Sequence, residues 1–161
     1  MDGKKVCEST VTMAQIMIPE HANPAGNVHG GMVVKIIDEA AAVVAARHSR
    51  SNVVTASIDR IDFHHPIFVG DLLFFKASLN LVGRTSMEIG VRVEAENLMT
   101  GQVRHAASAY LTFVAIDKQG KPAPVPPLVL ETEEDRRRNC EAKARRDVRL
   151  AERNKERSCK G

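Results

Sequence analysis

The sequence predicts an α+β domain in which a curved antiparallel sheet wraps around one buried helix. Residues 32–46 are apolar nearly all round, with Lys35, Asp38 and Glu39 as their only charged residues, whereas a surface helix has a polar face. Three later segments alternate apolar and polar residues with a period of two, as strands with one buried face do. Because a sheet with one apolar face needs a covering layer, we expect the apolar helix to supply it.

The first half of the chain predicts a strand, a loop, the buried helix and a second strand. Residues 10–18 are apolar and β-prone, and Pro19 ends the strand that they predict. Residues 21–31 contain the Gly, Asn and Pro residues that favour turns. A polar break over 48–52 ends the helix, and the β-branched residues of 53–63 predict the second strand.

The three alternating strands follow, joined by turns at 83–84 and 99–101 that are short enough for hairpins. An irregular arm over 117–127 then leaves the sheet, because its prolines cannot donate to a strand ladder. The positions predicted to share the buried face are Leu73, Phe75, Ala77, Leu79 and Leu81, then Met87, Ile89, Val91, Val93 and Ala95, then Val103, Ala107, Ala109, Leu111, Phe113 and Ala115.

Residues 131–161 form a charged segment that we treat as separate from the domain over 1–130. Thr132 is a suitable helix N-cap, and the acidic residues 133–135 lie at the favourable positive end of the helix dipole. Apolar positions are few, so the outer part of this predicted helix is a candidate for disorder. The segment holds 11 Lys and Arg residues against 8 Asp and Glu, whereas the other 130 residues hold 12 of each.

The excess positive charge therefore lies in this segment, where it resembles the footprint of nucleic-acid binding. Because acidic residues interleave with the basic ones and no aromatic residue is present, we expect no specific nucleic-acid partner and at most weak, salt-sensitive association. No apolar run is long enough to cross a bilayer, and the first ten residues lack the apolar segment of a secretory signal. We expect a cytoplasmic protein. Cys7, Cys140 and Cys159 have neither disulfide-framework nor metal-ligand spacing.

Asp38 is the leading candidate for chemistry. A carboxylate in an apolar helix is costly unless it is paired or used, and such groups cluster at functional sites. The alternative is an ion pair with Lys35 or with a partner chain. Gly30 and Gly31 open the helix, where free N–H groups and the dipole suit a developing oxyanion; a tight helix entry explains the same residues. His29 has both an acid–base and a structural interpretation.

Several short motifs occur together in a specific order. They are Ala25–Gly31 (AGNVHGG), Lys35–Ala41 (KIIDEAA), Val54–Asp59 with Ile61–Phe63, Gly83–Ser86 (GRTS), and the arm Pro124–Pro127 leading to Glu131–Glu133. Together they resemble the cytosolic acyl-CoA thioesterase (acyl-CoA hydrolase) family of the hotdog superfamily. The resemblance is closest to bacterial single-domain members and to one half of the two-domain animal enzymes. It covers about residues 8–140, so the basic tail from about Arg145 lies beyond it.

The resemblance implies a hotdog fold, with a curved sheet of five to six strands around the central helix. It implies hydrolysis of acyl-CoA to free fatty acid and CoA without metal or cofactor, since coenzyme A is itself part of the substrate. It implies homodimers with two sites at the interface, often assembled as trimers of dimers. The catalytic residues of the family map onto Asn27 and Asp38.

In this interpretation Asp38 acts as general base on water, Asn27 positions the water or the thioester, and the N–H groups of Gly30 and Gly31 hold the thioester oxygen. Direct attack by Asp38 is an open alternative. The hairpin residues Gly83, Arg84, Thr85 and Ser86 are candidates for contact with the CoA phosphates, or form an ordinary turn.

Asp38 follows Gly30 by eight residues, which is about 12 Å along a helix. Asn27 and Asp38 of one chain are therefore unlikely partners at one thioester, and we expect each site to take Asn27 from one subunit and Asp38 from the other. The alternative function is that of a non-hydrolytic acyl-CoA binding or sensor protein on the same fold.

Overall fold

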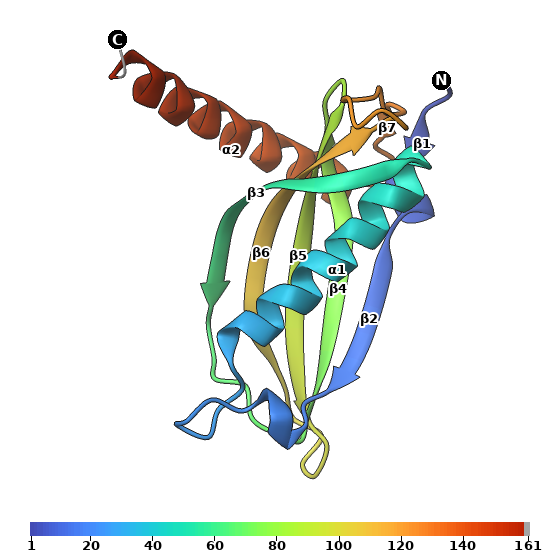
Figure 1. The fold of residues 1–161 in the computed structure, drawn as a ribbon. Helices are drawn as coiled ribbons and strands as arrows, with labels where there is room; N and C mark the ends of the chain where they lie inside the picture. Colours follow the sequence, from blue (N-terminus) through green and yellow to red (C-terminus); the bar gives the residue numbers. More distant parts are fainter. Residues whose placement is uncertain (160–161) are drawn as a thin grey trace.

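A computed structural model describes residues 1–159 of the chain. The elements in chain order are β1 (Lys4–Lys5), η1 (Val6–Glu8), β2 (Val11–Ile16), η2 (Pro19–His21), α1 (Gly30–Ser49), β3 (Asn52–Phe63), β4 (Asp71–Val82), β5 (Ser86–Asn97), β6 (Val103–Ile116), β7 (Leu128–Val129) and α2 (Glu133–Ser158). The main sheet has five antiparallel strands in the order β2-β4-β5-β6-β3 and curves around α1 (Figure 1). The predicted α+β architecture is confirmed.

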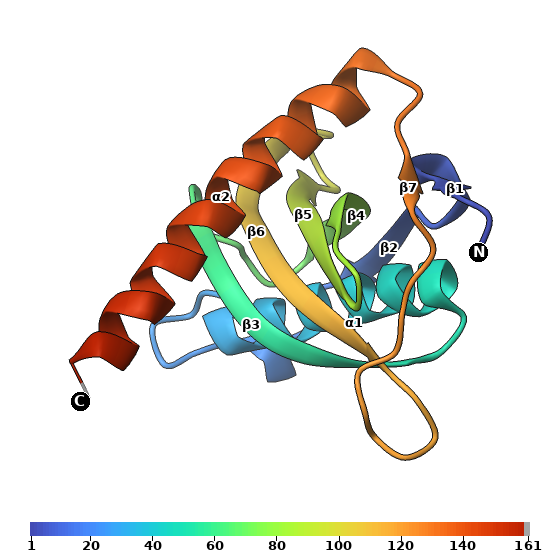
Figure 2. The same ribbon diagram turned by 90° about the horizontal axis from the view of Figure 1, so that it is seen from above.

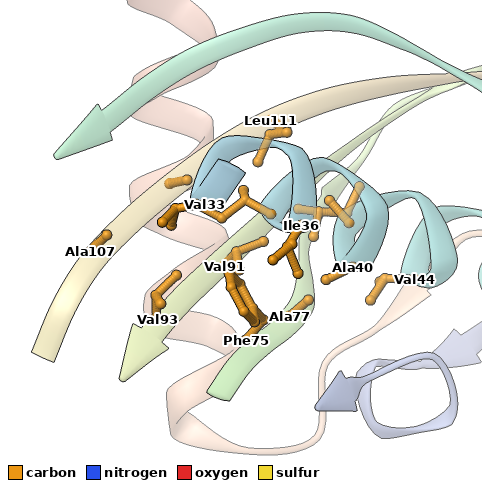
Figure 3. Close-up of a cluster of buried hydrophobic side chains, with 14 of the residues drawn as sticks. Val33, Ile36, Ala40, Val44, Phe75, Ala77, Val91, Val93, Ala107 and Leu111 are labelled. Carbon is orange, nitrogen blue, oxygen red and sulfur yellow. The ribbon is translucent and has the colours of Figure 1, made fainter. Parts of the chain in front are cut away.

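The core forms where α1 lies against the middle strands of the sheet. Side chains that recur every three or four residues along α1 meet the alternating residues of β4, β5 and β6, as the two periodicities require. Figure 3 shows this contact for Val33, Ile36, Ala40 and Val44 of α1 and for Phe75, Ala77, Val91, Val93, Ala107 and Leu111 of the strands. Each of these side chains is at most 2% exposed.

The alternation in β6 holds everywhere except at its start. Val103 was predicted to face the core, but it is 53% exposed. The pairing of β6 with β5 shifts between Val93 and Glu94, which pair with Ala107 and His105 and leave Ala106 as an extra residue. Such a β-bulge reverses which face the preceding residues occupy, so Val103 points to solvent.

The far end of α1 is fixed by a buried histidine. His48 is fully buried, its Nε2 donates to the carbonyl of Pro126 at 2.8 Å, and Ser9 Oγ lies 3.4 Å from its Nδ1. Burial, with a smaller contribution from nearby Lys4, lowers the pKa of His48. A neutral imidazole thus connects the N-terminal segment, α1 and the proline-rich arm.

Helix α2 crosses the opposite face of the sheet from α1 (Figure 2). Its hydrogen bonds to the sheet include those from Arg138 to Ser78 Oγ at 2.9 Å and from Asn139 to the carbonyl of Asn80 at 2.8 Å. Ala142 of the same helix is fully buried. The second half of the tail, where disorder was considered, is helical through Ser158. It contacts the sheet through Arg145 and Arg149, whose partners the sequence did not reveal. Neither helix, within residues 1–159, has the length and apolar character needed to span a membrane.

Candidate active site

The loop before α1 folds into a compact turn around Asn23. The Asn23 N–H donates to the carbonyl of Asn27 at 2.7 Å. The Asn23 side-chain oxygen accepts the N–H groups of Ala25 at 3.0 Å and Asn27 at 3.2 Å. Gly26 completes the turn at a φ of 88°, a conformation that glycine adopts without strain. These bonds occupy the carbonyl side of the Asn23 amide and leave its NH₂ group as the available donor.

This turn borders a cavity of about 400 Å³ between the loop, the start of α1 and the β3–β4 connection. The backbone joins the two loops, since the Val28 N–H donates to the carbonyl of Ile67 at 2.9 Å and Asn27 pairs with Phe68. The lining residues are Asn23, Asn27, Val28, Gly30, Val33, Phe63, His64, His65, Pro66 and Ile67. The lining thus combines two asparagines and two histidines with apolar side chains, a combination that suits a polar head attached to an aliphatic chain.

The first turn of α1 contributes Gly30 to the cavity. His29 is the N-cap of the helix, and its Nδ1 accepts the N–H of Gly31 at 2.9 Å. This is the structural role that the sequence left open for His29. Both glycines were expected to offer N–H groups to an oxyanion; within residues 1–159 the Gly31 N–H is already used, and Gly30 is the one that lines the cavity.

Asp38 lies farther along α1, on the side that faces β3. Its Oδ1 accepts a hydrogen bond of 2.7 Å from the Thr55 hydroxyl. Lys35 pairs with Glu39 at 3.8 Å instead of with Asp38, so the ion-pair interpretation with Lys35 is wrong. Of the residues that the structure describes, Asp38 is not among those lining the cavity of Asn23 and Asn27. Sequence reasoning missed Thr55, although it lies within one of the recognised motifs.

The residues Gly83 to Ser86 form the β4–β5 turn. The Gly83 N–H donates to the carbonyl of Ser86 at 2.8 Å, and the carbonyl of Arg84 accepts the Val125 N–H at 3.0 Å. The Arg84 side chain is exposed. The turn lies at the opposite end of β4 from the cavity (Figure 1). Within one chain, therefore, it does not come close to the Asn23 turn.

The chain is similar to known thioesterases. The thioesterase superfamily model matches residues 25–102. An uncharacterized acyl-CoA thioester hydrolase of Bacillus subtilis is 44% identical over 128 residues, which cover 80% of this chain and 74% of that protein. The chain belongs to the acyl-CoA thioester hydrolase family. The cytosolic acyl coenzyme A thioester hydrolase of Rattus norvegicus is 41% identical over 87% of this chain, but the chain spans only 37% of that relative's length.

Solved structures of the same family have the same fold. A hexameric acyl-CoA thioesterase is 40% identical, with a TM-score of 0.91 over 94% of this chain and 97% of that chain. The acyl-CoA hydrolase of Staphylococcus aureus, solved with butyryl coenzyme A and coenzyme A, is 34% identical. Its TM-score is 0.90 over 97% of this chain and 95% of that chain. The hotdog fold expected from the motifs is thereby confirmed.

Proposed function

We propose that this chain hydrolyses acyl-CoA thioesters to a free acid and CoA. The observation that carries the proposal is the Asn23 turn. The side-chain oxygen of Asn23 is bonded within the turn, and Asn23 lines a cavity that the start of α1 and apolar side chains also border. A thioester has the matching chemistry, with a carbonyl oxygen that accepts hydrogen bonds and an aliphatic chain. The reaction needs no metal or cofactor, because a carboxylate base and water supply the proton acceptor and the nucleophile.

Asn23 is the asparagine that we assign to the reaction. Variants of the Staphylococcus aureus enzyme have been solved with one asparagine, one aspartate or one threonine replaced by alanine, at positions separated by 15 and 17 residues. In this chain the same residue types recur at these spacings as Asn23, Asp38 and Thr55. Asn27, the residue predicted from the sequence, then contributes through its backbone, since its N–H orients the Asn23 amide.

Asp38 takes the proton of the attacking water in this mechanism. The water oxygen bonds to the thioester carbon, the carbonyl becomes an oxyanion, and collapse of the tetrahedral intermediate breaks the C–S bond and releases the CoA thiolate. The Asn23 amide and the Gly30 N–H stabilise the oxyanion. The Thr55 hydroxyl donates to one oxygen of Asp38 and thereby leaves the other to face the water. In the alternative route Asp38 attacks directly, and solvent oxygen-18 would enter its side chain after one turnover.

We propose that each site is completed by two subunits. Asp38 lies about 12 Å along α1 from Gly30, whereas the loop of a second chain related by a two-fold axis can approach it. The open edge of β3, with the exposed side chains of Val54 and Ile58, is the surface that we assign to this homodimer. The hexameric relative supports a trimer of such dimers, in which the Gly83–Ser86 turn of another subunit would contact the CoA phosphates. We propose the cytoplasm as the compartment.

The test is thiol release from acyl-CoA esters of increasing chain length. We expect turnover by the wild-type protein and a loss in kcat of at least about 10²-fold in Asp38→Asn, with CoA binding retained. Glu39→Gln is the matched control, because it removes the neighbouring charge and its surface ion pair. CoA binding without thiol release by the wild type would replace hydrolysis by the sensor function, and near-normal turnover of Asp38→Asn would remove Asp38 from the mechanism.

A further inference from the structure

Arg104 of β6 and Asp71 at the start of β4 form an ion pair beneath the β3–β4 connection. The guanidinium contacts Asp71 Oδ2, and the two side chains are 17% and 4% exposed. Exposed pairs of long side chains hold little fixed geometry, whereas the loss of one partner of a buried pair leaves an uncompensated charge. This pair is therefore suited to hold a particular backbone arrangement.

Both partners also bind the backbone of the connection over residues 64–70. Arg104 donates to the carbonyl of Pro66 at 3.2 Å, and its guanidinium carbon lies 5.3 Å from the centre of the Phe68 ring. Asp71 Oδ2 accepts the N–H of Phe68 at 2.9 Å. Phe68 is thus held at its ring by the cation and at its N–H by the carboxylate.

The Asn23 turn rests on this same connection. Asn27 pairs with Phe68, and the N–H of Val28 donates to the carbonyl of Ile67 at 2.9 Å. The N–H of Asn27 in turn donates to the side-chain oxygen of Asn23 at 3.2 Å. A continuous series of contacts therefore runs from the ion pair through Phe68 and Asn27 to the Asn23 amide.

We propose that Arg104 is a positioning residue for thioester cleavage, because it fixes with Asp71 the loop that orients the Asn23 amide. Among the described residues, neither partner lines the cavity, so the ion pair acts on the reaction through the loop. The inference rests on the proposed role of Asn23. It is tested by one experiment on the reaction and by one that requires no reaction.

The first experiment is a double-mutant cycle between Arg104→Gln and Asn23→Ala. We expect Arg104→Gln to lower kcat about 10-fold or more, since small displacements of positioned groups are costly, with KM nearly unchanged. In the Asn23→Ala background the same substitution should cause no further loss, because the amide that it positions is gone. Lys76→Gln, which removes the exposed ion pair with Glu94, is the control and should leave kcat unchanged. Losses that multiply, or an unchanged kcat in Arg104→Gln, would overturn the proposal.

The second experiment is hydrogen exchange of the full-length protein with Arg104→Lys. Lysine keeps the positive charge opposite Asp71, but it lacks the planar fork that contacts Asp71 and Pro66 together. We expect faster exchange over residues 22–31, where the Asn27 and Gly26 N–H groups are bonded within the turn, and unchanged exchange in β5. Unchanged exchange over 22–31, or an equal rise throughout the sheet, would contradict positioning. This readout stands even if the wild-type protein fails to cleave thioesters.

Discussion

Arg145 of α2 and Glu88 of β5 are joined by an ion pair with an N–O distance of 2.7 Å on the outer face of the sheet. The Glu88 side chain is 2% exposed. Its Oε1 accepts both Arg145 and the amide of Asn80, and the guanidinium also lies 3.7 Å from the centre of the Tyr110 ring. The charged segment, which the sequence analysis treats as separate from the domain, therefore neutralises a buried carboxylate of the sheet.

Loss of this pair should destabilise the fold. We expect Arg145→Ala to lower the free energy of unfolding by about 2–4 kcal/mol, because Glu88 remains buried without a counterion. The double variant Arg145→Ala with Glu88→Gln should recover part of this loss, since no charge is then left buried. Urea unfolding of the three proteins measures the difference. Truncation after Leu150, which retains Arg145, is the control; an equal loss in both would assign the effect to helix length.

The two asparagines of the loop before α1 should differ in their effect on turnover. Asn23→Ala removes the amide donor, and we expect kcat to fall at least about 10²-fold, the range for the loss of one oxyanion donor. Asn27→Ala retains the backbone N–H that orients Asn23, so its loss should be about 10-fold or less. Thiol-release kinetics of both variants measure the ratio. The reverse order would return the catalytic role to Asn27.

Mixed subunits should restore activity if the site is shared. Asn23→Ala and Asp38→Ala proteins are each expected to be nearly inactive. When they are refolded together, about half the dimers are mixed, and each mixed dimer has one site with both residues intact. About a quarter of all sites should therefore recover. Recovery is measured by thiol release, and mass spectrometry confirms the mixed dimers. An inactive mixture that contains them would place both residues of a site in one chain.

The fold was predictable where the residue pattern within one segment identifies the helix or strand that it forms. The buried helix follows from its missing polar face, and the strands follow from their alternation of apolar and polar residues. The prediction failed at Val103 because the alternation does not reveal a β-bulge. The Asn23 turn was predictable as a loop, but its internal hydrogen bonds were not. Thr55 and Arg104 were missed because their partners, Asp38 and Asp71, lie 17 and 33 residues away. Such pairs depend on strand register and helix packing, which local sequence does not encode.

Stability should depend on pH through His48. Burial lowers its pKa in the folded protein, so the native state binds this proton only at a lower pH than the unfolded chain does. The free energy of unfolding should therefore fall as the pH drops below about 6.5, by at most about 1.4 kcal/mol per pH unit. His48→Gln retains a donor for the Pro126 carbonyl and cannot titrate. In urea unfolding of this variant, we expect the free energy of unfolding to depend less steeply on pH between pH 7 and 5 than in the wild type. An unchanged slope would assign the pH dependence to groups other than His48.

The open edge of β3 links folding to concentration. Within residues 1–159 this strand of 12 residues pairs on one side only, with β6. If the other side stays uncovered, its unpaired N–H and C=O groups can pair with strands of other chains in a non-native way. If a second copy covers this edge, part of the stability of each chain comes from the contact with the other. Mass action then makes the melting temperature rise with protein concentration. A separated chain would then be a precursor of aggregates as well as an inactive half-site, so dissociation and loss of the native protein should occur together.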